Sequence, residues 1–475
     1  MASFTLLPDE LLLAILTQAA CVRSIKRALR LRLVSKRFAN IATTAIFNSG
    51  ILDCEEIFSY IYRGPIFWAE YLAYRTLMHT RQKSPYMKIT LLVAQHICRY
   101  RNASADETCV ATGAATDGQL RECVLGLCIM FTLRLEMASS RLSWMLVAST
   151  DAPEEEVDEA SLEFKRYLLS AAAWIGEKSL VVKLVGEGCN YADEPGIMMC
   201  LAPLRAASYR GHVDIVKFLM VDDSGEAPDL RKRPNLIVTY AMLNDHTELL
   251  DLAMDPSWHR GELMPEDYHD LRILALSSAS NLETFIRLFE DMKPDITKYE
   301  SIWLPSGAAE QGHATILKYL IDKEGTEVNA DFSNNMSLFQ SRCPAKFRTN
   351  LFGITDYTLL GRAARAGHMN VVKILLDAGA KHGHAMQFAA MSGSRTLVRL
   401  LWEHGENKDD PVQGAFATAV DRENTAMFYL LEEMGAKLED DVRAAMIQKA
   451  QEEGLESMVR LLSKDANVSS EGDVD

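Results

Sequence analysis

Residues Thr358–Ala380 read TLLGRAARAGHMNVVKILLDAGA, and this stretch decides the fold. Leu360, Ala363 and Ala364 are spaced as i, i+3 and i+4, so they share one face of a short helix. Gly367 follows and can take the left-handed conformation that ends a helix. A second apolar stripe then precedes Gly379 and consists of Val371, Val372, Leu375 and Leu376. Two short antiparallel helices cannot bury this much apolar surface alone, so the stretch predicts neighbours of the same kind.

The same pattern recurs along the chain at a spacing near 33 residues. When the turn residue is counted as zero, apolar side chains follow at +4, +5 and +8. Six copies have glycine at the turn, and three weaker copies have another residue there. A self-similar period of this length, built from helix–turn–helix units, is typical of a solenoid. The predicted turn residues are Gly176, Gly211, Asp245, Ser280, Gly312, Gly367, Gly393, Glu423 and Gly454.

Two of these copies resemble ankyrin repeats, whose pattern is TPLHxAAxxGHxxIVxxLLxxGA. They read PLRAASYRGHVDIVKFLM from Pro203 and LLGRAARAGHMNVVKILLDAGA from Leu359. The resemblance covers about Phe164 to Asn467 and implies an all-α fold, with an ankyrin-repeat solenoid of about eight or nine repeats over 161–467. Because the TPLH tetrapeptide is intact nowhere, we expect an irregular stack.

The spacing of 55 residues between Gly312 and Gly367 leaves about 22 residues beyond one repeat. They predict an insertion at about 330–357 that contains several apolar side chains. The insertion either covers the stack or forms part of a binding surface. Residues 468–475 are polar and acidic, and we expect them to be disordered.

The first fifty residues are the second informative stretch. LLPDELLLAIL starts a helix with Pro8 and two acids, and a second helix is expected from Ala28 through Phe38 towards Phe47. The segment resembles an F-box, whose pattern is LPxELLxxIL followed by LRxVSKRWxxL. That resemblance implies docking on the Skp-type adaptor of a cullin–RING ubiquitin ligase. The alternative is an N-terminal helical cap on the solenoid. The adaptor-binding residues implied by the motif are Leu7, Pro8, Leu11, Ile15, Leu33, Val34 and Phe38.

Residues 51–160 are predicted as a helical linker with an acidic end. Apolar periodicity indicates helices at 57–74, 86–100 and 119–146, with a small-residue loop at 102–118 between the last two. None of these helices belongs to a glycine-terminated pair. We expect them to seal the first repeat, and residues 151–160 to form a solvated acidic linker or helix start.

Composition narrows the class of partner. The formal net charge is −15, of which residues 1–50 contribute +5 and the remainder −20. An acidic solenoid argues against nucleic acid as a ligand.

The longest apolar run, 123–133, is too short to cross a bilayer, so no membrane association is expected. Nine cysteines without a CxxC pair fit reduced thiols in a cytoplasmic or nuclear protein, and Cys123 and Cys128 are expected to be buried structural residues.

The chain lacks the sequence motifs of the common enzyme classes. No P-loop, GxSxG, HExxH or dinucleotide fingerprint is present, so we expect no catalysis and no cofactor. His212, His313 and His368 each follow a turn glycine and are interpreted as structural hydrogen-bonding residues. His382 and His384 lack a third ligand nearby, which argues against a metal site.

These observations leave two hypotheses for function. In the first, the chain is a substrate-recognition subunit of a Skp–cullin–F-box ligase, with the solenoid binding a target protein. In the second, it is a non-ligase ankyrin scaffold or regulatory protein. Ankyrin stacks bind through hairpin tips and the exposed faces of first helices, which implies Tyr299, Trp303 and Tyr357 as target-binding candidates. Packing of Trp303 against the preceding repeat is the alternative for that residue. The acidic balance suggests a basic patch on the target.

Overall fold

The structure is a computed structural model of the 475-residue chain, and the part it describes contains helices and no strand. The predicted all-α class is therefore confirmed for this part. The chain divides into two compact units, unit 1 (residues 1–240) and unit 2 (residues 241–475). The described residues are 7–22, 25–53, 65–78, 85–105, 117–136, 157–189, 201–221, 237–238, 241, 244–255, 269, 272–273, 275–293, 296, 298–329, 358–405 and 410–469.

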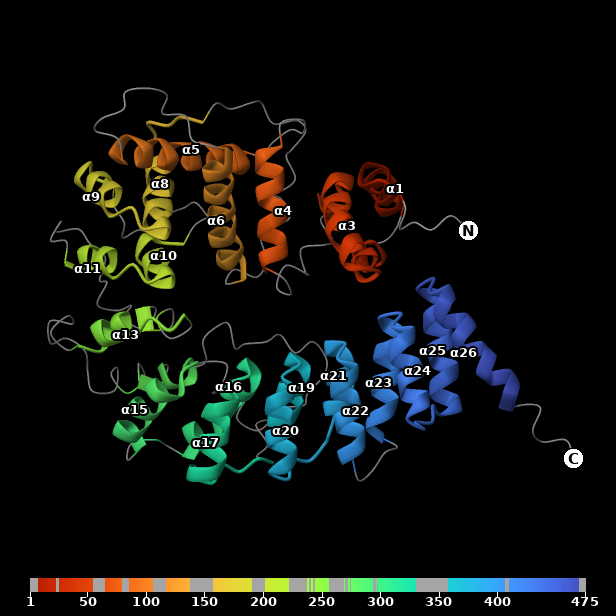
Figure 1. The fold of residues 1–475 in the computed structure, drawn as a ribbon. Helices are drawn as coiled ribbons and strands as arrows, with labels where there is room; N and C mark the ends of the chain where they lie inside the picture. Colours follow the sequence, from red (N-terminus) through yellow and green to blue (C-terminus); the bar gives the residue numbers. More distant parts are fainter. Residues whose placement is uncertain are drawn as a thin grey trace, which may run out of the picture. The chain divides into compact units, whose positions relative to one another are not determined.

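Unit 1 begins with three short helices, of which the first and third share a small core. They are α1 (Asp9–Cys21), α2 (Ile25–Arg30) and α3 (Lys36–Ser49), with one-turn 3₁₀ helices at Leu31–Leu33 (η2) and Ile51–Asp53 (η3). Helices α1 and α3 pack on each other (Figure 1). The buried cluster between them comprises Leu12, Leu16, Ala42 and Ala45.

The single helix expected from Ala28 towards Phe47 is wrong, because the chain breaks at Ser35. This residue is extended, with φ −164° and ψ 168°, and its hydroxyl accepts a hydrogen bond from the Phe38 amide at 3.1 Å. A serine in this position satisfies one of the amides that a helix start leaves without a partner. The cap therefore ends η2 and starts α3 in a new direction.

The next three helices are α4 (Pro65–Leu77), α5 (Pro85–Ala105) and α6 (Asp117–Glu136). The helices predicted at 57–74, 86–100 and 119–146 are confirmed where the structure describes them, whereas 57–64 and 137–146 lie outside the described residues. Helix α4 runs beyond its predicted end, and α5 continues into the stretch expected to be a loop. Helix α4 packs on α6, and both α5 and α6 contact α8. The Thr90 and Tyr167 hydroxyls are 3.0 Å apart in the buried contact between α5 and α8. The residues after α3 are therefore packed directly on the first predicted repeat.

Two helix pairs complete unit 1. They are α8 (Leu162–Ile175) with α9 (Lys178–Gly186), and α10 (Pro203–Arg210) with α11 (Val213–Val221). First helices pack on each other, α8 on α10, and second helices do the same, α9 on α11. This two-layer stacking is the packing predicted from the 33-residue period.

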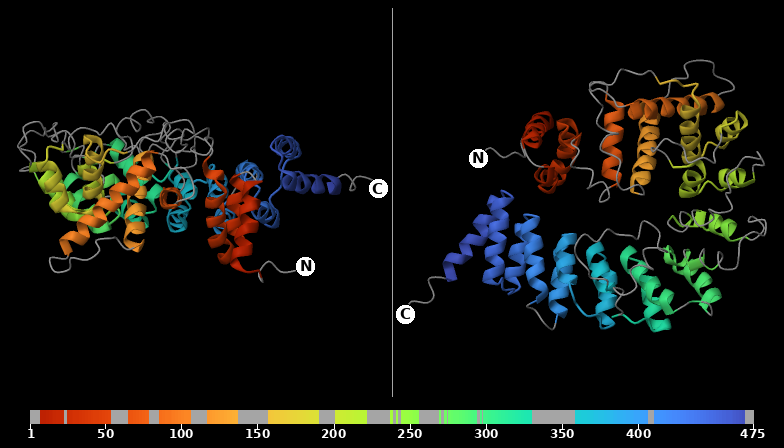
Figure 2. Two further views of the ribbon diagram at one scale, coloured as in Figure 1. Left: turned by 90° about the horizontal axis from the view of Figure 1, so that it is seen from above. Right: turned by 180° about the vertical axis from the view of Figure 1, so that it is seen from behind.

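Unit 2 by itself is also a two-layer stack, and its pairs stand side by side in chain order (Figure 1; Figure 2). First helices α16, α19, α21, α23 and α25 form one layer, each packed on the next. The elements of unit 2 are α13 (Thr247–Met254), α15 (Leu282–Met292), α16 (Lys298–Gln311), α17 (Ala314–Glu324), α19 (Leu359–Ala366), α20 (Met369–Asp377), α21 (Ala385–Ser392), α22 (Arg395–His404), α23 (Asp410–Asp421), α24 (Thr425–Glu433), α25 (Asp440–Glu452) and α26 (Glu456–Ser469).

Eight of the nine predicted turns are confirmed by the backbone. All six turn glycines have φ between +67° and +93°. Asp245 and Glu423 replace glycine in two weaker copies and still have φ of +57° and +46°. Ser280 does not share this conformation. Instead, Asn281 caps α15 with its side chain, accepting hydrogen bonds from two amides of the first turn.

A glycine is required at some of these turns for a second reason. A Cβ atom placed on Gly312 would lie 2.6 Å from the ring of His368, and one on Gly176 would lie equally close to His212. The histidine of each following pair therefore occupies the space of a side chain at the preceding turn. Both the positive φ and this close approach favour glycine.

Most apolar side chains at +4, +5 and +8 are buried between neighbouring pairs; Leu288 and Val459 are the partly exposed exceptions. In α20, Val371, Val372 and Leu375 are fully buried, as predicted, whereas Leu376 is only half-buried. The expectation that both leucines are buried is therefore wrong for Leu376, which lies one residue beyond the +8 position and turns towards the helix edge.

Helix packing bridges the predicted insertion. Residues 330–357 lie outside the described part, but α16 packs on α19 and α17 on α20 across them. The Asn329 side chain donates to the Gly379 carbonyl at 3.0 Å and accepts from the Lys381 amide at 2.7 Å. The described residues on both sides of the insertion therefore stack as adjacent pairs.

Candidate protein-binding surfaces

Helix α1 has an apolar face on each side. Its inner face carries Leu12 and Leu16, which are buried against α3. Its outer face carries Leu11 and Ile15, whose side chains are 55% and 43% exposed. Because positions 11 and 15 are one turn apart, the two side chains form one stripe. We call Leu11, Ile15 and Val34, which is 63% exposed, the N-terminal apolar face.

Exposed apolar groups are concentrated in this region. Eight large hydrophobic side chains are exposed in the described part of the chain, and four of them lie between Leu11 and Val34. Single exposed apolar residues are ordinary, but four within one short helical segment are typical of an interaction site. The helices that present it are already packed, so the cluster does not arise from missing neighbours within α1–α3.

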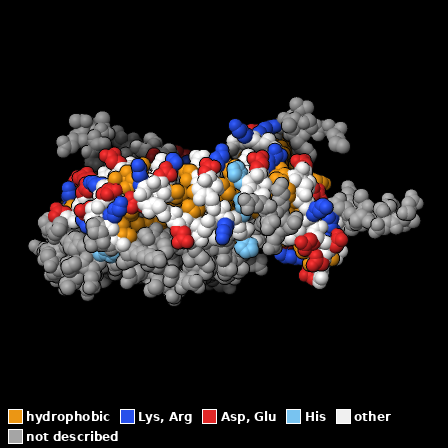
Figure 3. Space-filling view, turned by 90° about the horizontal axis from the view of Figure 1, so that it is seen from below, with side chains coloured by type: hydrophobic (Ala, Val, Ile, Leu, Met, Phe, Trp, Pro, Cys, Tyr) orange, Lys and Arg blue, Asp and Glu red, His pale blue; other side chains and the backbone are white. Residues whose placement is uncertain are grey.

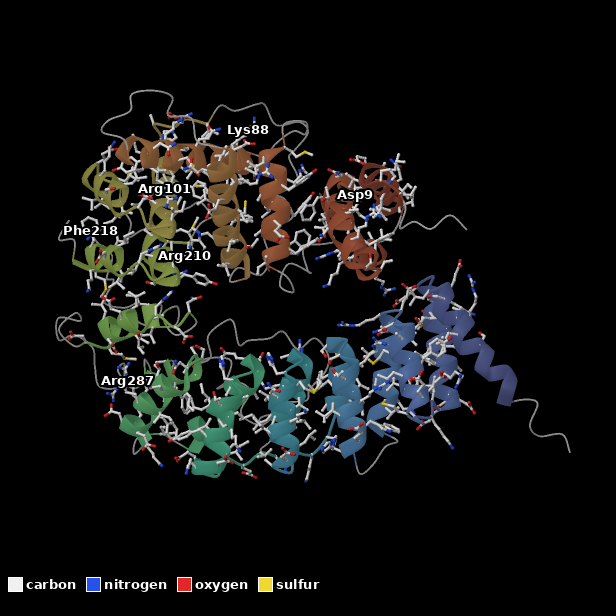
Figure 4. The ribbon with its side chains drawn as sticks, viewed as in Figure 1. Asp9, Lys88, Arg101, Arg210, Phe218 and Arg287 are labelled. Atoms are coloured by element: carbon white, nitrogen blue, oxygen red, sulfur yellow. The ribbon has the colours of Figure 1, made fainter. Side chains whose placement is uncertain are left out.

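Arg37 fixes the start of α1 against α3. Its Nε donates to Asp9 Oδ1 at 2.9 Å, and its Nη2 donates to the Leu7 carbonyl. Figure 4 labels Asp9 at this position on α1. Pro8 is exposed at the N-cap of α1, and Leu7 is half-buried beside it. The predicted Leu-Pro start of the motif therefore lies at the edge of the N-terminal apolar face.

Two of the predicted adaptor-binding residues differ in their surroundings. Phe38 is half-buried and packs against the Leu12 and Leu16 cluster, so it supports the core of α1–α3 more than the outer face. A role of Phe38 in adaptor binding stays a prediction. Leu33 belongs to η2, and its side chain lies outside the described residues.

The target-binding candidates lie largely outside the described side chains. Tyr299 and Trp303 belong to α16, a first helix, as the repeat pattern predicts, but only their backbone is described. Tyr357 lies outside the described residues. These three residues therefore stay predictions.

Sequence reasoning missed a buried ion pair between two first helices. Arg362 on α19 is 8% exposed, and its Nη1 donates to Glu310 Oε2 on α16 at 2.7 Å. Burial raises the pKa of the Glu310 carboxyl, and the Arg362 charge partly opposes that shift. The signal in the sequence was an arginine at the centre of LLGRAARA, within an otherwise apolar helix face.

Two of the three histidines that follow turn glycines link successive pairs, whereas His313 Nε2 lies 3.4 Å from Gln311 Oε1 in its own pair. His368 Nε2 lies 3.0 Å from the Glu310 carbonyl, and His212 Nε2 lies 3.1 Å from the Trp174 carbonyl. Each imidazole ring therefore lies within hydrogen-bond distance of a carbonyl near the end of the preceding first helix. This arrangement confirms their interpretation as structural residues.

Cysteines and histidines offer no metal centre in the described part of the chain, where no three metal-ligating side chains come together. Cys123 and Cys128 are buried as predicted, and burial raises the pKa of each thiol to about 12. Cys123 neighbours Cys98, whose pKa is also raised by burial. At neutral pH these thiols are protonated, which suits packing rather than nucleophilic chemistry.

Comparison with known families identifies part of the stack. The family model for three copies of ankyrin repeats matches residues 306–412. Residues 306–412 are ankyrin repeats. The match begins inside α16 and ends inside α23, so it covers the most regular pairs of unit 2. No curated protein matches the chain in sequence.

The ankyrin repeats are a protein-interaction module. On the face that Figure 3 draws, basic and acidic side chains are interspersed. The sequence of unit 2 as a whole carries 23 Lys and Arg residues against 38 Asp and Glu residues, a net charge of −15. Unit 1 has 27 of each and no net charge. Among the described helices, none is both long and apolar enough to cross a bilayer.

Proposed function

We propose that the chain is a substrate-recognition subunit of a Skp–cullin–F-box ubiquitin ligase. The observation that carries the proposal is the N-terminal apolar face, in which Leu11, Ile15 and Val34 are exposed above a filled core. The F-box motif places the same residues at the docking surface for a Skp-type adaptor. The ankyrin repeats would then bind the target protein, with Tyr299, Trp303 and Tyr357 as anchors.

In this role the chain breaks no bond itself. It holds a target near the ubiquitin-carrying arm of the ligase and so raises the effective concentration of the reacting groups. The negative charge of unit 2 favours a target with a basic patch, because complementary charge increases the rate of encounter. The assignment carries with it a cytoplasmic or nuclear location.

The decisive experiment is binding of the full chain to a purified Skp-type adaptor. Leu11→Ala combined with Ile15→Ala should weaken binding by at least tenfold, because burial of each side chain is worth roughly 1.5–3 kcal/mol. Val182→Ala combined with Leu162→Ala is the matched control, since both side chains are exposed elsewhere in unit 1. Unchanged affinity in the Leu11 and Ile15 variant would remove the ligase assignment.

The second candidate function is a non-ligase ankyrin scaffold or regulatory protein. The match to ankyrin repeats over 306–412 supports it without any contribution from the first fifty residues. Phe47 on α3 packs against Phe67, Tyr71 and Tyr74 of α4, a contact that a helical cap would also make. Copurification of the full chain without a Skp-type adaptor would favour this function.

A further inference from the structure

The N-terminal apolar face borders a fixed contact between η2 and α4. The guanidinium carbon of Arg32 lies 5.1 Å from the centre of the Phe67 ring. The same ring lies 5.4 Å from that of Phe47, which is 6% exposed. Phe67 is therefore held both by a cation and by an aromatic neighbour from the N-terminal helices. This contact fixes the first turn of α4 relative to η2.

Two exposed side chains flank this contact. Val34 follows Arg32 by two residues and is 63% exposed, and Ile66 precedes Phe67 and is 66% exposed. Ile66 lies sixteen residues beyond the F-box-like segment, at the second position of α4. The Arg32–Phe67 contact thus joins the two elements that carry these exposed side chains, η2 with Val34 directly after it and α4 with Ile66 in its first turn.

Charge around this surface defines the chemistry of its partner. Residues 1–50 contain seven Lys and Arg residues and two Asp and Glu residues. Asp9 and Arg37 pair with each other, so six Lys and Arg residues and one acid, Glu10, lie outside this pair. Lys36 is exposed two residues after Val34. The sequence that carries these apolar groups therefore has a basic excess, which complements a partner that presents apolar side chains among acidic ones.

We propose that the adaptor footprint extends beyond the first fifty residues onto α4, with Ile66 as an additional anchor beside Val34. The occupant is the adaptor of the proposed function, on which this inference rests, and it contacts Ile66 through apolar side chains bordered by acids. The Arg32–Phe67–Phe47 contact positions Ile66 for this partner.

The test compares the affinities of full-length variants for a purified Skp-type adaptor. Ile66→Glu should weaken binding on the order of tenfold, because it removes apolar burial and places a carboxylate in a surface that faces acids. Val182→Glu introduces the same charge at an exposed valine of α9 in the same unit and should leave affinity unchanged. Hydrogen exchange in the first turn of α4 should slow when the adaptor binds.

The outcomes separate this inference from the proposed function. If Leu11→Ala with Ile15→Ala abolishes binding while Ile66→Glu has no effect, the footprint ends within the first fifty residues and the inference fails alone. If neither variant changes affinity, both fail. Equal weakening by Ile66→Glu and Val182→Glu would overturn the inference, because the effect would come from added charge in general. Lys36→Glu should lower the rate at which the chain associates with the adaptor. An unchanged association rate would contradict the claim that the facing surface of the adaptor is acidic.

Discussion

At the scale of single residues, stability of the stack depends on groups that meet across neighbouring pairs. Gly312 and His368 are the clearest case. The His368 imidazole occupies the space that a side chain at position 312 would need. Glu310 contributes twice to the same junction, through its carboxylate to Arg362 and its carbonyl to His368.

Gly312→Ala should destabilise unit 2 more than Gly393→Ala. Both residues have φ near +80°, so each substitution costs about 1–2 kcal/mol for left-handed backbone. Only the alanine at 312 would also displace a histidine ring, because a Cβ at 393 meets no atom within 4 Å. Urea unfolding of the two variants measures the difference. Equal losses, or a difference that persists in a His368→Ala background, would contradict this explanation.

The ion pair between Glu310 and Arg362 should make the free energy of unfolding depend on pH. The folded pKa of Glu310 is raised above 4.5, so the folded state binds more protons than the unfolded state between 4.5 and the folded value. Stability from this group is therefore complete below pH 4.5 and is lost as the pH rises through the folded pKa.

Arg362→Met should strengthen this dependence, because it removes the charge that opposes the shift. We expect the free energy of unfolding to fall by about 3 kcal/mol at pH 7 and to recover partly when the pH is lowered. Urea midpoints at a series of pH values measure it. In the double variant with Glu310→Gln the extra pH dependence should disappear, and its persistence would assign the effect to another group.

At the scale of elements, helix pairs stack as units whose connections are replaceable. The packing of α16 and α17 on α19 and α20 is made by the described helices, and Asn329 joins the two sides through two hydrogen bonds.

Deletion of residues 334–355 should preserve the stack. It removes 22 residues and restores a spacing of 33 between Gly312 and Gly367. Shortening a loop reduces the entropy of closure, so we expect equal stability or a gain of up to about 1 kcal/mol. Thermal unfolding of unit 2 in the full chain measures this. A large loss would show that the insertion covers the stack and contributes to its core.

At the scale of the whole molecule, stability should be distributed between two units. Each unit has its own buried core, and in a stack of pairs the interactions are between nearest neighbours. Charge is distributed unequally as well, since the entire excess of −15 belongs to unit 2.

Leu375→Ala should therefore produce a local loss. The side chain is fully buried, and its truncation should cost about 2–5 kcal/mol. Leu376→Ala is the matched control, because Leu376 is half-buried and should cost less. Hydrogen exchange should increase in α19–α22 and stay unchanged in α1–α6. Loss of protection throughout unit 1 would show that the chain unfolds as one cooperative unit.

The sequence alone determined the helix pairs, their turns and their inward-facing side chains. These follow from local causes, namely a 3.6-residue periodicity and residues that tolerate positive φ, as at Gly367. The left-handed turns at Asp245 and Glu423 could be located from the period even without glycine.

Only the tertiary structure decided which surfaces the helices leave exposed. By sequence, Leu11, Leu12, Ile15 and Leu16 are all strongly apolar. Packing of α1 on α3 buries Leu12 and Leu16, whereas Leu11 and Ile15 remain exposed. The Glu310–Arg362 pair and the contact between Arg32 and Phe67 join residues 52 and 35 positions apart. Such contacts depend on how helices pack, and no local periodicity encodes them.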